Sequence, residues 1–475
     1  MKYDRRRTKI VCTLGPATNT ANMIERLIKR GMNVARFNLS HGSHDEHANH
    51  IKTVRESAEQ LDAHLLILMD LPGPKYRTGS LENGSAVLKK GAKITLTTRQ
   101  ITGNAEMVPV NLPSLPLDVK VGDIVFLDDG AIQLRIQEIS SLDVRCRVLI
   151  GGQLTPGRGV VVPKMRTSGP FITEQLRQHI EFAIQQQPDY IAISFVSSAE
   201  DVIQTRAVLQ QSDYSIPIIA KIERGQAVTN FNRILAASDG IMVARGDLGV
   251  DIALPKIPLA QKEIIKKCNQ AGKPVITATQ MLESMVTSAR PTRAEVTDVA
   301  NAIFDGTDAI MLSAETSVGK YPVEAVRMMA QIAMETENQL PYEKMLTERG
   351  EWLELQTDEL ISYNACHTAC MLDAVAIIAP TQSGSTARRI SKYRPQMPIL
   401  ALTSDARVRN QLLLCWGVQS YQIAELSSVN EFFVKATGLV KELGLAKPGD
   451  LVVITGGIPL GIAGSTNLLK VEEVL

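Results

Sequence analysis

The chain has 475 residues, too many for one ordinary domain, so we expect two or three domains with well-developed cores. Its 51 basic and 50 acidic side chains nearly cancel, which gives no reason to expect a nucleic-acid or membrane partner through bulk charge. No apolar run reaches the roughly 18 residues that cross a bilayer, and the basic N-terminus leads into a strand pattern rather than a secretory signal. The six cysteines form no CxxC pair, so we expect buried thiols and a cytoplasmic location.

Short apolar runs that end in a polar or charged residue recur along most of the chain. There are eight: Lys9–Gly15, Asn33–Asn38, Leu65–Asp70, Tyr190–Val196, Ile216–Glu223, Gly240–Gly246, Pro274–Gln280 and Asp308–Glu315. Apart from one long gap, the stretches between them have helix patterns; the first, Ala21–Arg30, follows a possible N-cap at Thr20 and ends at Gly31. Eight such units are what a (β/α)8 TIM barrel requires.

In a barrel of this kind the reactive groups lie where the strands end, on the loops that lead into the helices. Position alone therefore makes six residues active-site candidates: Asn38, Asp70, Lys221, Glu223, Asp247 and Thr279.

The long gap between the third and fourth strands predicts a small all-β domain. Short alternating segments are joined there by turns rich in Gly or Asp. They are Lys93–Thr97, Asp123–Leu127, Ala131–Glu138 and Val144–Leu149. Because this segment interrupts a loop of the barrel on its reactive face, the inserted domain is well placed to act as a lid.

Beyond the barrel, the charged stretch Glu343–Gln356 is typical of a connection. Five further strand patterns alternate with helices and predict a separate α/β domain with a mostly parallel sheet. They are Val375–Ala379, Ile399–Thr403, Val418–Ile423, Leu451–Thr455 and Lys470–Val474. We predict a barrel from residues 1–70 and 170–341, an inserted β-barrel lid at 71–169 and a regulatory α/β domain at 342–475.

The pattern around Lys221 suggests a metal site. Lys221 and Glu223 alternate with Ile222, so both project to the same side of the fifth strand. Asp247 follows the sixth strand between two glycines, which let a ligand approach the backbone closely. Carboxylates from neighbouring strand ends suit Mg²⁺ or Mn²⁺, to which substrate and water add oxygen ligands. The alternative is an ordinary inward salt bridge between Lys221 and Glu223.

Three other residues at strand ends indicate an anionic substrate. Arg36 ends the second strand and Arg77 follows the loop after the third, and two arginines that converge on one face favour a phosphorylated or carboxylated molecule. Thr279 ends the seventh strand, where its hydroxyl could bond a carboxylate or relay a proton. An ordinary strand threonine explains Thr279 nearly as well from the sequence alone.

Seven strings are specific enough to identify a family. They are Thr8–Pro16 (TKIVCTLGP), Gly31–Gly42 (GMNVARFNLSHG), Lys221–Arg224 (KIER), Ala244–Gly249 (ARGDLG), Thr277–Met285 (TATQMLESM), Arg290–Ala302 (RPTRAEVTDVANA) and Met311–Thr316 (MLSAET). Together they closely resemble pyruvate kinase, in the family's order and along nearly the whole chain. The family transfers the phosphoryl group of phosphoenolpyruvate to ADP, giving pyruvate and ATP in the last step of glycolysis. Its members are usually cytoplasmic homotetramers.

The resemblance implies a role for each matching residue. Glu223 and Asp247 are implied as ligands of an essential Mg²⁺ or Mn²⁺, and Lys221 as the cation that neutralises the phosphoryl group in flight. Arg36 is implied as a catalytic, phosphate-binding residue. The Gly246–Asp247 backbone and Thr279 would hold the substrate carboxylate, with Thr279 also serving the proton relay.

The nucleotide side and the cation sites follow from the same resemblance. Residues implied on the nucleotide side are Asn38, Ser40, His41, Arg77 and Arg158, the last where the family usually has lysine. Many members have Thr after the aspartate of the third strand and bind K⁺ there, whereas this chain has Leu71, and Lys75 where they have Glu. We therefore expect an enzyme that works without K⁺. Asn38, Ser40 and Asp70 remain, so a K⁺ site completed by water is the alternative.

The segment Pro380–Thr386 joins a strand to a helix and offers an anion site, because hydroxyls and backbone N–H groups gather at a helix N-terminus. A plain capped helix start is the alternative from the residues alone. Regulated family members bind a sugar-phosphate effector here, which implies an effector phosphate, from a sugar phosphate or a nucleotide monophosphate, at Thr381, Ser383, Ser385 and Thr386.

Two other functions stay open at this point. One is a different metal-dependent barrel enzyme that acts on phosphoenolpyruvate or a keto acid. The other is a catalytically inactive, sugar-phosphate-binding regulatory protein of the same fold. The intact set of Lys221, Glu223, Asp247 and Thr279 argues against the inactive protein.

Overall fold

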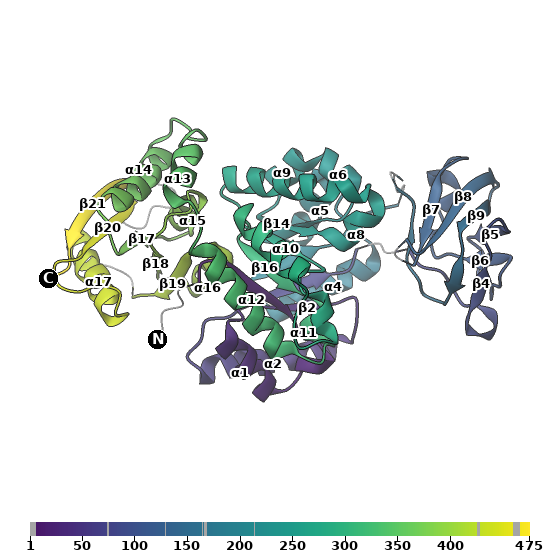
Figure 1. Cartoon of the computed structure of the whole chain (residues 1–475), viewed down its shortest axis with the longest axis horizontal. Coiled ribbons are helices and arrows are strands. Elements are labelled where there is room, and N and C mark those ends of the chain that lie inside the picture. The colour runs from purple at the N-terminus through teal and green to yellow at the C-terminus, as the bar shows by residue number, and fades with distance from the viewer. Residues whose placement is uncertain are drawn as a thin grey trace.

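The structure is a computed structural model that describes residues 6–73, 76–128, 130–163, 165, 169–212, 214–424, 428–458 and 466–475. Three bodies lie in a row (Figure 1). A β domain is at one end, a barrel surrounded by helices is in the middle, and an α/β domain is at the other end. Among the described residues, no helix combines the length and the apolar character needed to cross a membrane.

The central body is a closed barrel of eight parallel strands, which confirms the predicted (β/α)8 fold. In chain order the strands are β1 (Lys9–Thr13), β2 (Val34–Asn38), β3 (Leu66–Leu71), β12 (Tyr190–Ile193), β13 (Ile218–Ile222), β14 (Gly240–Ala244), β15 (Val275–Ala278) and β16 (Ala309–Leu312). The strands are buried on both faces, which is why they appear in the sequence as continuous apolar runs.

Helices surround the barrel. They are α1 (Ala21–Arg30), α2 (His44–Gln60), α4 (Glu174–Gln186), α5 (Ala199–Leu209), α6 (Gly225–Thr229), α7 (Phe231–Ala237), α8 (Arg245–Asp251), α9 (Ile257–Gln270), α10 (Arg293–Phe304), α11 (Ala314–Ser317) and α12 (Pro322–Glu337). The longer ones, such as α4, α9 and α12, bury apolar residues. Helix α1 has the predicted bounds: the Thr20 hydroxyl accepts the Met23 N–H at 3.3 Å, and Gly31 ends the helix at a φ of 116°.

The β domain leaves the barrel after β3 and returns before α4. Its main sheet has the order β11-β7-β8-β9-β5-β6, and β4 pairs with β10. The elements are β4 (Ala86–Leu88), β5 (Lys93–Thr97), β6 (Met107–Pro109), α3 (Leu115–Asp118), β7 (Ile124–Leu127), β8 (Ile132–Ile139), β9 (Asp143–Ile150), β10 (Gly152–Leu154) and β11 (Val160–Val161). The curled sheet encloses its own apolar core, which includes Leu96, Val108 and Leu134.

The C-terminal body is a five-stranded sheet of order β19-β18-β17-β20-β21, parallel except for the antiparallel edge strand β21. Its elements are α13 (Tyr342–Gly350), α14 (Thr357–Met371), β17 (Ala376–Pro380), α15 (Ser385–Lys392), β18 (Ile399–Thr403), α16 (Ala406–Gln411), β19 (Val418–Gln422), α17 (Val429–Glu442), β20 (Leu451–Gly457) and β21 (Thr466–Glu473). The stretch read as a plain connection is largely helix α13, which buries Leu346 and Arg349.

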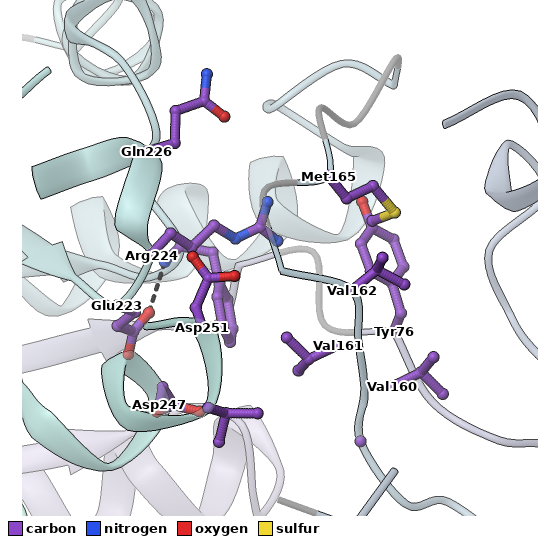
Figure 2. Close-up of a pocket in the computed structure, with 13 residues that line it drawn as sticks. Tyr76, Val160, Val161, Val162, Met165, Glu223, Arg224, Gln226, Asp247 and Asp251 are labelled. Carbon is purple, nitrogen blue, oxygen red and sulfur yellow. Dashed lines mark hydrogen bonds between the residues drawn. The ribbon is translucent and has the colours of Figure 1, made fainter. Parts of the chain in front are cut away.

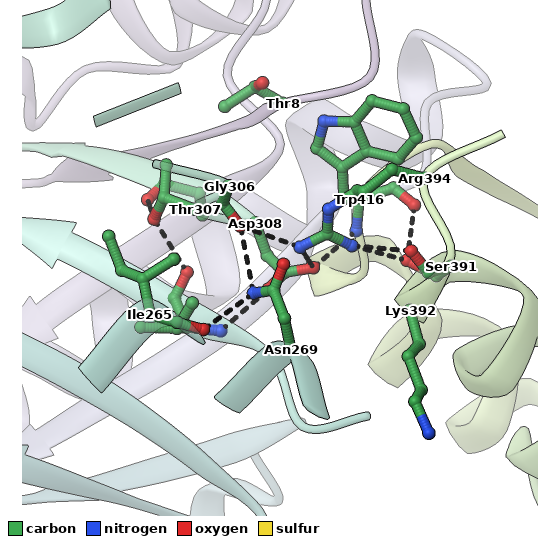
Figure 3. Close-up of polar contacts among 12 residues, drawn as sticks. Thr8, Ile265, Asn269, Gly306, Thr307, Asp308, Ser391, Lys392, Arg394 and Trp416 are labelled. Carbon is green, nitrogen blue, oxygen red and sulfur yellow. Dashed lines mark hydrogen bonds and ion pairs between the residues drawn. The ribbon is translucent and has the colours of Figure 1, made fainter. Parts of the chain in front are cut away.

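The C-terminal domain packs against the amino ends of the barrel strands (Figure 3). Arg394 extends from the end of α15 to Asp308, the residue before β16, with Nη2 3.0 Å from Oδ1, and it donates to the Gly306 carbonyl at 2.9 Å. The Asp308 carboxylate also accepts backbone N–H groups from Trp416 and Val275. The opposite, carboxyl ends of the strands therefore face the β domain.

Candidate active site

A cleft lies between the carboxyl ends of β13 and β14 and the β domain (Figure 2). Its empty volume, open mouth included, is about 670 Å³. The barrel side contributes Phe195, Glu223, Arg224, Gln226, Asp247, Val250 and Asp251, and the β-domain side contributes Tyr76, Gly159, Val160, Val161, Val162 and Met165. The cleft is polar on the wall that the barrel provides and apolar on the wall that the β domain provides.

Beside this cleft, four buried charged residues from three strands contact one another. The Lys221 ammonium lies 2.9 Å from Glu223 Oε1 and 3.3 Å from Asp70 Oδ1. Arg36 donates to Asp70 Oδ2 through Nε at 2.8 Å, with Nη2 at 2.7 Å from the same oxygen. Each of the four is less than 9% exposed. The parallel register sets Arg36 opposite Leu68, two residues before Asp70, so the two side chains share the barrel interior.

Burial and mutual pairing shift the ionisation of this cluster. Burial alone would raise the pKa of Asp70, but Lys221 and Arg36 lower it below its usual value. Burial alone would lower the pKa of Lys221, but the Asp70 and Glu223 carboxylates raise it, so the lysine stays a cation. Burial raises the pKa of Glu223 against the attraction of Lys221, and the nearby Asp247 carboxylate raises it further.

Glu223 and Asp247 form an oxygen-rich edge of the cleft. The Phe195 N–H donates to Glu223 Oε2 at 2.6 Å, and Phe195 holds a φ of 59° there. Asp247 lies in the first turn of α8. Two carboxylates fit a hard divalent cation, which takes oxygen ligands and commonly keeps water or substrate oxygens among them. Within the described ranges no group of three His, Cys, Asp or Glu side chains is placed to hold a metal, so other oxygen ligands would have to join these two carboxylates around a metal ion.

Thr279 lies at the end of β15, beside the start of α8. Its hydroxyl accepts the Gly246 N–H at 2.8 Å and donates to the Ala278 carbonyl at 2.6 Å. Its own carbonyl accepts a hydrogen bond from Arg245 at 2.8 Å. The predicted neighbours Gly246 and Thr279 are therefore in direct contact, at the ends of the two strands that follow β13 in the barrel order.

The residues expected on the nucleotide side are more dispersed. Asn38 Oδ1 accepts the Ser40 N–H at 3.2 Å, and His41 is exposed on the same loop. Arg77 donates to the Gly157 carbonyl at 2.7 Å, and Arg158 pairs with Asp128 at 3.3 Å, so the recorded contacts of both arginines stay within the β domain and do not involve Arg36. Of the residues considered for K⁺, Asp70 belongs to the charged cluster and Lys75 lies outside the described residues.

The loop after β17 has hydroxyls close together, far from the barrel cleft. Thr381 is 8% exposed, and its Oγ1 has no hydrogen-bond partner within the described part of the chain. The Ser383 and Ser385 hydroxyls are 3.2 Å apart, and the Thr386 hydroxyl bonds that of Thr466 at 2.8 Å. Gly384, with a φ of 80°, precedes the first residue of α15.

Sequence reasoning missed two residues of the barrel site. The Ser194 hydroxyl accepts a hydrogen bond from Lys221 at 2.8 Å and donates to Asp70 at 3.3 Å. Arg245 binds the 279–281 segment from the end of β14. Both residues directly follow a barrel strand, because β12 ends at Ile193 and β14 ends at Ala244. The expectation that reactive groups lie at strand ends would have included them if these two strand ends had been predicted correctly.

Comparison with known proteins places these features in one family. The family model described as "Pyruvate kinase, barrel domain" matches residues 5–326, and "Pyruvate kinase, alpha/beta domain" matches residues 359–472. A pyruvate kinase from Geobacillus stearothermophilus is 47% identical over 473 residues, covering 99% of this chain and 81% of the relative. One from Staphylococcus aureus is 44% identical over 471 residues, covering 99% of this chain and 80% of the relative.

The three-dimensional fold gives the same result. The crystal structure of a pyruvate kinase from Cryptosporidium parvum superposes with a TM-score of 0.95 at 38% identity, covering 99% of this chain and 97% of that one. Sequence and structure agree over all three bodies, so this chain belongs to the pyruvate kinase family and is a phosphotransferase.

Proposed function

We propose that this protein transfers the phosphoryl group of phosphoenolpyruvate to ADP, and that the cluster of Arg36, Asp70, Lys221 and Glu223 is where it does so. The observation that carries the proposal is the buried ammonium of Lys221 between two carboxylates beside an open cleft. Phosphoryl transfer depends mainly on positioning and on neutralising charge on the moving group. Lys221 on β13 and Arg36 on β2, both buried and both in contact with Asp70, would provide that neutralisation.

In the reaction, the bond between the enol oxygen and phosphorus breaks while a bond forms between phosphorus and a β-phosphate oxygen of ADP. Lys221 would stabilise the phosphoryl group during transfer, and Arg36 would hold it in the ground state. The enolate that remains takes a proton at its methylene carbon and becomes pyruvate. Thr279, with the Gly246–Asp247 backbone, would hold the carboxylate and serve the proton relay.

Glu223 and Asp247 would hold Mg²⁺ or Mn²⁺, which supplies positive charge to the phosphoryl and carboxylate oxygens when bound. The donor set supports this role, because both side chains line the same cleft and offer carboxylate oxygens. Asn38, Ser40, His41, Arg77 and Arg158 would contact the nucleotide. For the two arginines this requires the β domain to close, since their present contacts lie within that domain.

Activity without K⁺ is part of the proposal. Leu71 is fully buried at the end of β3 and offers no oxygen ligand. The Asp70 carboxylate already accepts hydrogen bonds or ion pairs from Arg36, Lys221 and Ser194, so side chains rather than a free cation neutralise it.

A phosphorylated effector, either a sugar phosphate or a nucleotide monophosphate, is proposed for Thr381, Ser383, Ser385 and Thr386. The buried, unpartnered hydroxyl of Thr381 and the hydroxyl pair at the start of α15 support it. A homotetramer and a cytoplasmic location complete the proposal, the latter supported by six free cysteines. Light scattering at assay concentration tests the tetramer. A shift in the half-saturating phosphoenolpyruvate concentration on adding each phosphate tests the effector.

The decisive experiment measures pyruvate and ATP formed from phosphoenolpyruvate and ADP with Mg²⁺. Equal, ADP-dependent formation of both products is the expected result. Pyruvate formed without ADP would indicate a lyase or phosphatase, and no product at all would indicate an inactive regulatory protein. Either outcome would refute the proposed function.

A further inference from the structure

Thr279 has a left-handed backbone conformation, which is unfavourable for a threonine. Its φ is 71° and that of Gln280 is 55°, so two consecutive non-glycine residues lie in the left-handed region. For a β-branched residue this is a true outlier that costs free energy and persists only where the surroundings enforce it. Some contact must therefore hold this segment at the end of β15.

Arg245 provides that contact. Its Nη2 donates to the Thr279 carbonyl at 2.8 Å and lies 2.8 Å from Met281 Sδ. The next residue, Gly246, donates its N–H to the Thr279 hydroxyl at 2.8 Å. Two adjacent residues at the start of α8 thus hold both the carbonyl and the hydroxyl of Thr279.

The guanidinium is in turn fixed by a third element. Asp298, on helix α10, accepts from Arg245 Nη1 at 2.7 Å through Oδ1 and lies 2.7 Å from Nη2 through Oδ2. This two-point pairing sets the plane of the guanidinium, and the Arg245 side chain is only 10% exposed. Arg245 therefore contacts Asp298 on one side and the 279–281 segment on the other, so its guanidinium has a fixed place next to Thr279.

We propose that Arg245, oriented by Asp298, is a positioning residue that holds the Thr279 hydroxyl where the substrate carboxylate and the relayed proton need it. The inference rests on the proposed role of Thr279. Neither Arg245 nor Asp298 touches substrate in this account. They act through Thr279, so a displacement of its hydroxyl should appear in turnover more than in nucleotide binding.

The chain offers a matched control at the other end of the barrel. Arg206 donates to the Ala237 carbonyl at 2.8 Å and pairs with Asp239 at 2.8 Å. It is therefore also an arginine that holds a carbonyl and an aspartate, but at the amino ends of the strands. If Arg245 had only a structural role, replacing either arginine would affect stability and leave kcat alone.

The test is a double-mutant cycle on the full-length protein. We expect Arg245→Met to lower kcat about 10- to 100-fold with little change in the KM for ADP, and Arg206→Met to leave kcat within about twofold. In a Thr279→Ala background, Arg245→Met should lower kcat by less than about threefold more, because the residue it positions is gone. Arg245→Lys, which keeps one donor, should recover part of the loss.

Each other outcome counts against a specific claim. If Thr279→Ala keeps full kcat, the proposed role of Thr279 fails and the inference fails with it. If Thr279→Ala loses turnover but Arg245→Met does not, only the inference fails. Independent, multiplicative losses in the double variant would also overturn it. If Arg245→Met does not fold, Asp298→Asn takes its place. This variant must show a smaller loss of kcat than expected for Arg245→Met, and the loss must disappear in the Thr279→Ala background. An unchanged kcat of the Asp298→Asn single variant would refute the inference.

Discussion

The two ends of the barrel each bury a group of charged side chains, yet they satisfy the charges differently. At the amino end, Asp308 accepts two backbone N–H groups in addition to the Arg394 guanidinium, and the space beside it is about 210 Å³ (Figure 3). At the carboxyl end, Lys221 is held by side chains from three segments and lies near a cleft of about 670 Å³.

In the proposed function, this difference separates a structural ion pair from a reactive one. The two N–H groups that Asp308 accepts belong to the backbone of the barrel at Val275 and of the C-terminal domain at Trp416, and buried backbone groups need a partner. This carboxylate therefore helps to join the two domains. The recorded partners of Lys221 are the side chains of Asp70, Glu223 and Ser194, and in the proposed function its charge turns to the substrate when a ligand enters. A buried ion pair alone says little about function. The two ends differ in whether backbone groups or side chains complete the pair, and in the space beside it.

The largest effect we expect is from Lys221→Met. Losing the ammonium removes a cation that acts mainly on the transition state, and the loss of one such donor typically lowers kcat by about 10²–10³. Steady-state kinetics with circular dichroism as the fold control measures it. If KM for phosphoenolpyruvate rises while kcat is unchanged, Lys221 serves binding only and the contrast between the two ends weakens.

Removing a metal ligand should come next. Asp247→Ala deletes one of the two carboxylates, so half-maximal activity should need at least about tenfold more Mg²⁺, and kcat at ordinary Mg²⁺ should be largely lost. A Mg²⁺ titration of initial rates after chelation of bound metal gives both quantities. Near-normal turnover of the variant at low Mg²⁺ would contradict the assignment.

Arg394→Met tests the structural end. It leaves the buried Asp308 carboxylate without its cation, so the free energy of unfolding should fall by about 3 kcal/mol, while kcat per folded molecule stays within about twofold. Arg7→Met is the comparison variant, because Arg7 crosses the same interface to the Gln396 carbonyl, is 19% exposed and lies 3.8 Å from the Glu337 carboxylate, a longer separation than that of Arg394 and Asp308; it should cost less than Arg394→Met. Denaturant unfolding with parallel rate assays decides. A loss of kcat in Arg394→Met without lost stability would give the amino end a catalytic role.

The smallest effect concerns K⁺. Replacing K⁺ by an inert cation at constant ionic strength should change the initial rate less than twofold, because protein cations already pair with Asp70. Leu71→Thr combined with Lys75→Glu should make the enzyme responsive to K⁺. Tenfold or greater stimulation of the unmodified enzyme by K⁺ would show that a monovalent ion still belongs to the site.

The sequence predicted the barrel well because each strand is a continuous buried run, and alternation correctly paired Lys221 with Glu223. The predicted strand ends were wrong where a residue other than glycine has a positive φ. The strand expected to reach Val196 ends at Ile193, since Phe195 has a positive φ that no residue pattern announces. Helix α13 was not predicted from the polar stretch after the barrel. A helix that buries only a narrow stripe of its surface has few apolar residues, so its sequence shows little helical periodicity.

Contacts between residues far apart in the chain could not be predicted from the sequence either. Arg245 and Asp298 are 53 positions apart, and only the folded barrel brings them together. The Arg394–Asp308 pair joins two domains in the same way. The domain boundaries at residues 70, 169 and 341 and the individual roles of the site residues stay predictions.

The most direct test of the central claim is the ratio of kcat between Arg394→Met and Lys221→Met, each corrected for its folded fraction and assayed with phosphoenolpyruvate, ADP and Mg²⁺. Both substitutions remove one buried cation from an ion pair, one at each end of the barrel. We predict a ratio of about 100 or more, because in the proposed function only the carboxyl end performs chemistry. A ratio near one would contradict this account.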